Sequence, residues 1–139
     1  MDRNHRYTNA SDTVSIPAYL IGAAYIMSGN DNRDNAAYRL DVTVSQAAQA
    51  YMLIDNRLAD PNKGNANPPV FGPTRMKWIL DEGWAAVLTG KNRAGNPTFP
   101  DEVGIDEGAD GTINQWYSVY TKAFPAGTFQ LKQPDNSGQ

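Results

Sequence analysis

The sequence contains no cysteine and only one histidine, His5, which lies close to its beginning. The absence of cysteine excludes disulfide bonds, thiolate nucleophiles and cysteine-ligated zinc. A single histidine cannot build a multi-histidine metal site, and any Ser-His-Asp triad would depend on His5 alone. These two scarcities remove most metal-dependent and nucleophilic chemistry from consideration.

The 139-residue chain also lacks an excess of positive charge, with 12 Lys and Arg against 15 Asp and Glu. Without a basic surface, neither nucleic acid nor an anionic membrane is an expected partner. The longest apolar stretch, residues 16–27, is interrupted by Pro17 and Gly22 and is shorter than the roughly 18 residues of a transmembrane helix. Membrane insertion is therefore not expected, and no apolar signal-peptide segment is visible in the sequence.

Residues 38–44 alternate clearly between apolar and polar side chains, which predicts a half-buried strand. A second apolar segment, 48–56, follows after three residues, so the two segments predict a hairpin. A helix over residues 45–58 is the competing interpretation, because Ala, Gln and Leu favour helices. We prefer the strand.

Further strands are expected at 84–88, 116–124 and 128–132, with one or two helical turns within 74–83. The β-branched and aromatic residues of 14–27 predict two more short strands that bend near Gly22. The predicted fold is an all-β, antiparallel jelly-roll or Greek-key sandwich of about seven or eight short strands with long loops. Its domain spans residues 13–133, between a flexible arm at 1–12 and a polar tail at 134–139.

Seven short motifs along the chain are similar to those of jelly-roll modules in large secreted or surface proteins of environmental bacteria. They are GAAY at 22–25, NDNRDN at 30–35, YRLDV at 38–42, DNR at 55–57, GIDE at 104–107, QWYSVY at 115–120 and PAGT at 125–128. The resemblance implies an adhesive, glycan-binding or fibre-building role without a catalytic set of residues. It also implies a further apolar strand after 128–133, where this sequence has only the polar residues 134–139.

An incomplete sheet leaves an open edge that another chain can pair with. The apolar segment 13–20, behind its polar arm, is the predicted assembly strand and would be donated to a neighbouring copy. Pairing of the same segment within its own domain is the alternative interpretation. The residues of this strand that would contact the neighbour are Val14, Ile16, Pro17, Ala18, Tyr19 and Leu20.

Two other groups of residues are candidates for ligand binding. Asp106 and Asp110 lie in a glycine-rich acidic loop, where carboxylate oxygens could hold a structural Ca²⁺, although turn chemistry explains the same pattern. Trp78, Trp84 and Trp116 could form an exposed platform on which sugars stack, although aromatic residues more often fill a core.

Asn9 begins the sequon Asn-Ala-Ser and is a candidate for glycosylation. The adjacent acidic pairs Asp81–Glu82 and Asp101–Glu102 do not predict an acid–base couple, because neighbours on a strand point to opposite faces. We expect a protein that is not an enzyme and requires no cofactor.

The sequence therefore predicts a structural subunit of an extracellular bacterial filament, a homopolymer linked head-to-tail by N-terminal strand addition. The alternative is a secreted carbohydrate-binding module, stabilised by Ca²⁺, whose partners are glycans.

Overall fold

The computed structural model describes residues 6–8, 16–27, 35, 37–58, 68–72, 76–108 and 110–132. Within these residues the protein is an all-β sandwich of two antiparallel sheets, which confirms the predicted fold class. The elements are β1 (Arg6–Thr8), the 3-10 turn η1 (Ala18–Leu20), β2 (Arg39–Val44), β3 (Ala48–Asp55), α1 (Trp78–Asp81), β4 (Ala85–Ala86), β5 (Glu102–Asp106), β6 (Gln115–Phe124) and β7 (Gly127–Lys132).

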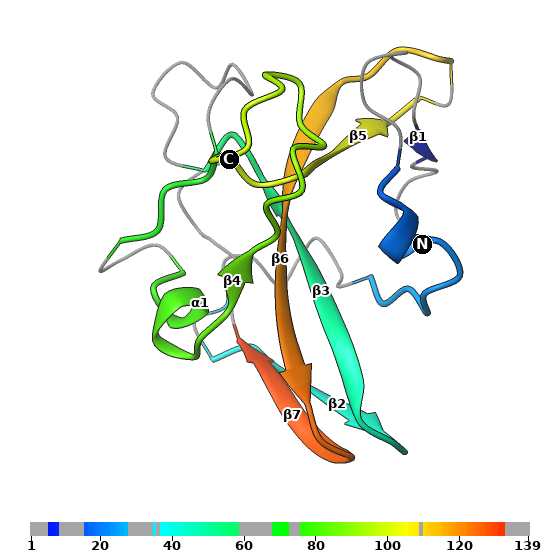
Figure 1. Cartoon of the computed structure of the whole chain (residues 1–139). Coiled ribbons are helices and arrows are strands. Elements are labelled where there is room, and N and C mark those ends of the chain that lie inside the picture. The colour runs from blue at the N-terminus through cyan, green and yellow to red at the C-terminus, as the bar shows by residue number, and fades with distance from the viewer. Residues whose placement is uncertain are drawn as a thin grey trace.

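The larger sheet is built around β6, which has neighbours along both of its edges. Its strand order is β1-β5-β6-β3, and the short strand β4 pairs with β6 beyond the end of β5. Figure 1 shows β3 and β6 running the length of the molecule, with β1 and β5 near one end and β2 and β7 near the other. Because β6 is central, its alternate side chains point into two different buried layers.

The smaller sheet consists of β2 and β7, and it continues the β3–β6 pair around a corner. The last pair of the small sheet is Val44 with Gly127, and the first pair of the large sheet is Ala48 with Phe124. The two paired strands thus bend at the same level, one over residues 45–47 and the other over residues 125–126. Strands bend in this way when they pass from one sheet of a sandwich to the other. The predicted hairpin between β2 and β3 is wrong, because each of the two strands pairs with a distant partner instead.

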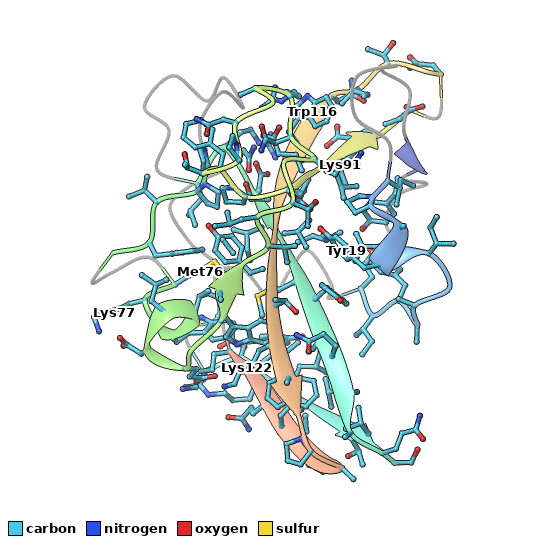
Figure 2. The ribbon with its side chains drawn as sticks, in the orientation of Figure 1. Tyr19, Met76, Lys77, Lys91, Trp116 and Lys122 are labelled. Atoms are coloured by element: carbon cyan, nitrogen blue, oxygen red, sulfur yellow. The ribbon has the colours of Figure 1, made fainter. Side chains whose placement is uncertain are left out.

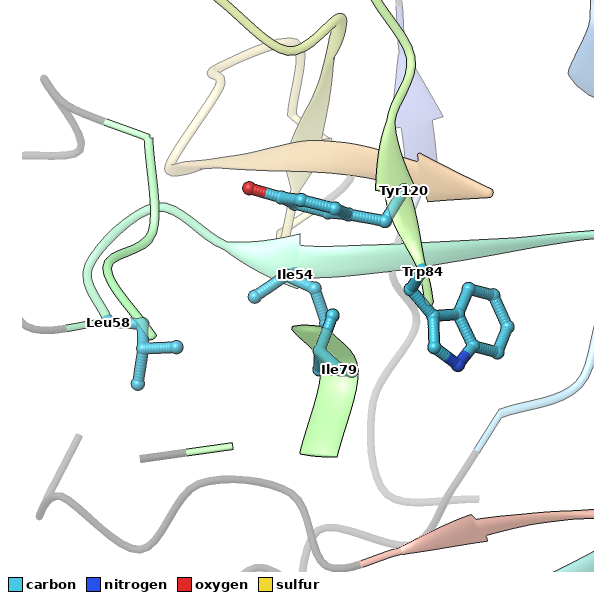
Figure 3. Packing of buried hydrophobic residues seen from close by; sticks show 5 residues of the cluster. All are labelled: Ile54, Leu58, Ile79, Trp84 and Tyr120. Atoms are coloured by element: carbon cyan, nitrogen blue, oxygen red, sulfur yellow. The ribbon is translucent and has the colours of Figure 1, made fainter. Parts of the chain in front are cut away.

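The main core lies where α1 packs against the larger sheet. Figure 3 shows its buried members, Ile54, Leu58, Ile79, Trp84 and Tyr120. Phe124 and Leu131 pack against this cluster from β6 and β7, so the corner of the ribbon closes one end of the core. The helix predicted within 74–83 is confirmed as the single turn α1, whose Ile79 is completely buried.

The N-terminal region differs from the two strands predicted within 14–27. Residues 18–20 form the turn η1, Gly22 has a positive φ of 81°, and residues 23–27 belong to neither sheet. Residues 6–8, which the sequence assigned to a flexible arm, form β1 and pair with β5. None of the helices among the described residues is long and apolar enough to cross a membrane.

Replacement of Ile79 by alanine tests the core. Ile79 is fully buried, so Ile79→Ala removes apolar contacts and leaves a cavity, and we expect the free energy of unfolding to fall by about 2–5 kcal/mol. The adjacent Leu80 is 54% exposed, so Leu80→Ala should change stability by less than about 0.5 kcal/mol. Urea denaturation of both variants measures the difference, and equal losses would contradict the assigned packing of α1.

Tyr120 gives the core a dependence on alkaline pH. Burial raises its pKa from 10.0 to about 12, because the phenolate loses its hydration inside the core. The stabilisation is fully present below pH 10.0 and is lost as the pH rises toward about 12, since the unfolded chain deprotonates first. The free energy of unfolding of Tyr120→Phe should therefore fall less over this range than that of the parent, as measured by denaturation at several pH values.

Candidate functional site

The N-terminal segment, residues 16–27, packs one half against the domain and exposes the other. In the first half, Pro17 is buried and the ring of Tyr19 stacks on Tyr51, with centroids 4.9 Å apart and planes 22° from parallel. The Tyr19 hydroxyl donates a hydrogen bond of 2.9 Å to Oδ2 of Asp101. Figure 2 labels Tyr19 on η1, beside the larger sheet. The segment therefore contacts β3 through Tyr51 and the residue preceding β5 through Asp101.

Asp101 is a fixed acceptor for this tyrosine. Its carboxylate is fully buried and also accepts hydrogen bonds from the amides of Thr89 and Lys91, at 2.8 and 3.1 Å, and from the Thr89 hydroxyl at 2.5 Å. Four donors compensate for the loss of hydration of one buried carboxylate. Burial and, to a smaller extent, the bond to Asp101 raise the pKa of Tyr19, so its hydroxyl remains a donor at all ordinary pH values.

The second half of the segment, residues 21–27, presents large apolar side chains to solvent. Ile21 is 74% exposed, Tyr25 58%, Ile26 56% and Met27 48%. Tyr25 meets the ring of Tyr7 on β1 edge to face, with 5.1 Å between centroids, and the two hydroxyls are in hydrogen-bond contact. A group of exposed apolar side chains of this kind is typical of an interaction surface.

The predicted assembly strand overlaps this region only in part. Val14 lies outside the described residues, Ile16, Tyr19 and Leu20 are half-buried, and Ala18 is exposed. None of the predicted residues from Ile16 to Leu20 lies in a strand. The most exposed apolar surface thus begins at Ile21, one residue after the predicted strand ends.

The β2–β7 sheet offers unpaired strand edges. It has two strands, and no other strand among the described residues pairs with either of them. Leu40, Val42 and Val44 on β2 and Phe129 and Leu131 on β7 are only half-buried. A two-stranded sheet of this kind is a marginal structure, and its free edges are templates for another strand.

The acidic loop uses its carboxylates to organise its own backbone. Asp106 is 2% exposed and accepts hydrogen bonds from the amides of Gly108, Asp110 and Gly111, at 3.1, 3.2 and 2.8 Å. Asp110 accepts a bond of 2.8 Å from the amide of Thr112. These contacts follow the turn chemistry that was the alternative explanation. No group of three or more His, Cys, Asp or Glu residues gathers among the described residues, and Ca²⁺ binding stays a prediction.

The predicted sugar-stacking tryptophans are mainly interior. Trp84 is 4% exposed and packs edge to face on Phe124, while Trp116 is 8% exposed and is covered by the guanidinium of Arg93 at 4.5 Å. Trp78 is half-buried against the core. Buried rings cannot present a flat face to a sugar, so the described structure does not contain the exposed platform. Asn9 lies outside the described residues.

A buried polar network, which the sequence did not predict, joins Asn56, the residue after β3, to β5 and β6. The Ser118 hydroxyl donates to Oδ1 of Asn56 and the Asn56 amide donates to Oε1 of Glu102, both at 2.6 Å. Arg93 forms an ion pair of 3.2 Å with Glu102. A pocket of about 250 Å³ lies beside this ion pair, lined by Pro68, Asn92, Arg93, Ala94, Phe99 and Glu102.

This network holds strands together. Asn56 and Ser118 are completely buried, and the polar side chains of the network bond to one another. Asp101 and Glu102 have separate partners, Tyr19 and Thr89 for the first and Asn56 and Arg93 for the second. Asp101 precedes β5 and Glu102 begins it, and the two carboxylates lie against different neighbours. The only signal in the sequence was the Asp101–Glu102 pair itself.

Comparison with known proteins adds no identification. No family profile, no curated protein and no solved structure matches this chain.

Removal of the central amide tests the polar network. Asn56→Ala removes the acceptor of the buried Ser118 hydroxyl and one of the donors to Oε1 of Glu102, which keeps its bond to Arg93, and we expect a loss of about 1–3 kcal/mol in the free energy of unfolding. Gln130 on the exposed face of β7 bonds to Asp41, and Gln130→Ala is the control, with an expected loss below about 0.5 kcal/mol. Thermal or urea denaturation that gives equal values for both variants would contradict this assignment.

Proposed function

We propose that this chain is a non-enzymatic structural subunit that assembles with identical copies into an extracellular filament through its N-terminal segment. The observation that carries the proposal is the exposed run Ile21, Tyr25, Ile26 and Met27, four large apolar side chains within seven residues. Full burial of a fully exposed apolar side chain contributes about 1.5–3 kcal/mol, and these side chains, being partly covered already, have roughly half of that to gain, so an assembly that buries several of them is favoured. The resemblance to modules of bacterial surface proteins supports the extracellular location.

Strand addition is the mode of contact that this surface favours. Residues 23–27 include the aromatic Tyr25 and the β-branched Ile26, side chains that strands favour, and they belong to neither sheet of their own domain. The free edges of β2 and β7 in a neighbouring copy are the acceptor that we propose. Donor and acceptor are different surfaces, so the contact is head-to-tail, and it repeats along a filament when its rotation does not close a ring.

A charge placed among the exposed apolar side chains of residues 21–27 tests the proposal. Ile26→Asp places a charge in the proposed interface, and we expect assembly to be lost at concentrations where the parent chain forms multimers. Leu80→Asp is the matched control, since Leu80 on α1 is 54% exposed against 56% for Ile26. Size-exclusion chromatography with light scattering, followed by electron microscopy, measures the state of all three proteins.

Two results would contradict the proposal. One is assembly of Ile26→Asp to the same extent as the parent, and the other is a parent chain that stays monomeric at every concentration. A monomer that binds selected glycans would instead favour the carbohydrate-binding alternative. The pocket beside Phe99, whose ring is 36% exposed, would then be the site to examine first.

A further inference from the structure

The N-terminal segment cannot act as one continuous strand in the conformation described here. Ala18–Leu20 form a 3-10 turn, with hydrogen bonds of 2.9 Å from the Leu20 amide to Pro17 and 3.2 Å from the Ile21 amide to Ala18. Gly22 follows with a positive φ of 81°, which lies outside the strand region. A strand that runs from 16 to 27 therefore requires this turn to open.

The contacts that hold the turn in place converge on Tyr19. Its ring stacks on Tyr51 of β3, and its hydroxyl reaches Asp101, a residue 82 positions away in the sequence. Asp101 keeps three other donors, from Thr89 and Lys91, so its position does not depend on Tyr19. The two sides of this contact thus differ. Tyr51 lies in β3 and Asp101 is held by its other donors, whereas Tyr19 is carried on the short turn η1.

We propose that Tyr19, Tyr51 and Asp101 form a latch that keeps residues 16–20 on their own domain, and that release of Tyr19 lets the strand added to a second copy extend from residues 23–27 back to residue 16. This inference rests on the proposed function and names the step that regulates it. The release is reversible, because the buried carboxylate retains its other hydrogen bonds when the tyrosine leaves. The segment therefore exchanges one set of partners for another, as in a two-state switch.

A latch of this kind makes the exposed half of the segment a first point of contact. Ile21 and Ile26 are available to a neighbour before release, whereas Ile16 and Tyr19 become available only afterwards. Assembly then proceeds by docking of residues 21–27, followed by opening of the turn. The population of the released state limits the rate of the second step.

Tyr51→Ala tests the latch without altering the segment that is donated. It removes the stacking partner of Tyr19, and we expect the amides of Leu20 and Ile21 to exchange hydrogen about tenfold faster in the dilute monomer. A tenfold change corresponds to about 1.4 kcal/mol. Assembly, followed by light scattering, should accelerate by the same factor. Tyr19→Phe keeps the ring and loses only the bond to Asp101, so a smaller increase is expected.

Controls separate this inference from the proposed function. Leu80→Ala, on α1 and outside both the latch and the β2–β7 sheet, should leave both rates unchanged. Tyr51→Ala combined with Ile26→Asp should exchange rapidly and yet not assemble. Unchanged exchange in Tyr51→Ala would show that there is no latch. Faster exchange without faster assembly would show that release does not limit the process. Assembly of Ile26→Asp would overturn the proposed function, while the exchange result would still stand.

Discussion

The structure depends on the burial of β6 on both of its faces. Val119 is completely buried and Tyr120 is 6% exposed, although neighbouring residues of a strand point in opposite directions. Two separate coverings are therefore required. The face of Tyr120 is closed by α1 and the corner into β7, and the N-terminal segment packs through Tyr19 on Tyr51, a residue of the opposite face. A single sheet with one solvated face would need only one covering.

This two-sided burial explains the unusual number of carboxylates inside a small domain. Asp101, Glu102 and Asp106 are all buried, and each accepts hydrogen bonds from several donors. A buried carboxylate is tolerated only when such donors replace its water. The donors come from loops, such as the amides of Thr89, Arg93 and Gly111. The acidic side chains near β5 therefore organise the loops around it, and this role explains their burial without invoking catalysis.

The sequence predicted the strands that alternate and missed the features that depend on distant contacts. The alternation of β2 and β7 was visible because one face of each is more apolar, whereas β6 was predicted only as a strand over 116–124. The pairing partner of β2 was not visible in the sequence, because a link of three residues fits a hairpin and a corner between sheets equally well. The sequence of β5 shows no alternation of apolar and polar residues, because its polar Glu102 is buried as well. Glu102 is buried against Asn56 and Arg93, which lie in other parts of the chain. The same limit applies to η1, where the Tyr19–Asp101 bond overrides the strand propensity around it.

The N-terminal segment combines two requirements that conflict. Its first half covers the sheet and is fixed by Tyr19, while its second half carries apolar side chains that its own domain leaves in water. Gly22 marks the boundary, since its positive φ turns the chain away from the course that η1 sets. In the assembly proposed above, burial of the whole segment would leave nothing for a second copy to contact. If the whole segment were free, the face of Tyr51 would lose its cover. A segment divided at Gly22 satisfies both conditions, because the contacts of Tyr19 hold the first half on the sheet and leave the second half exposed.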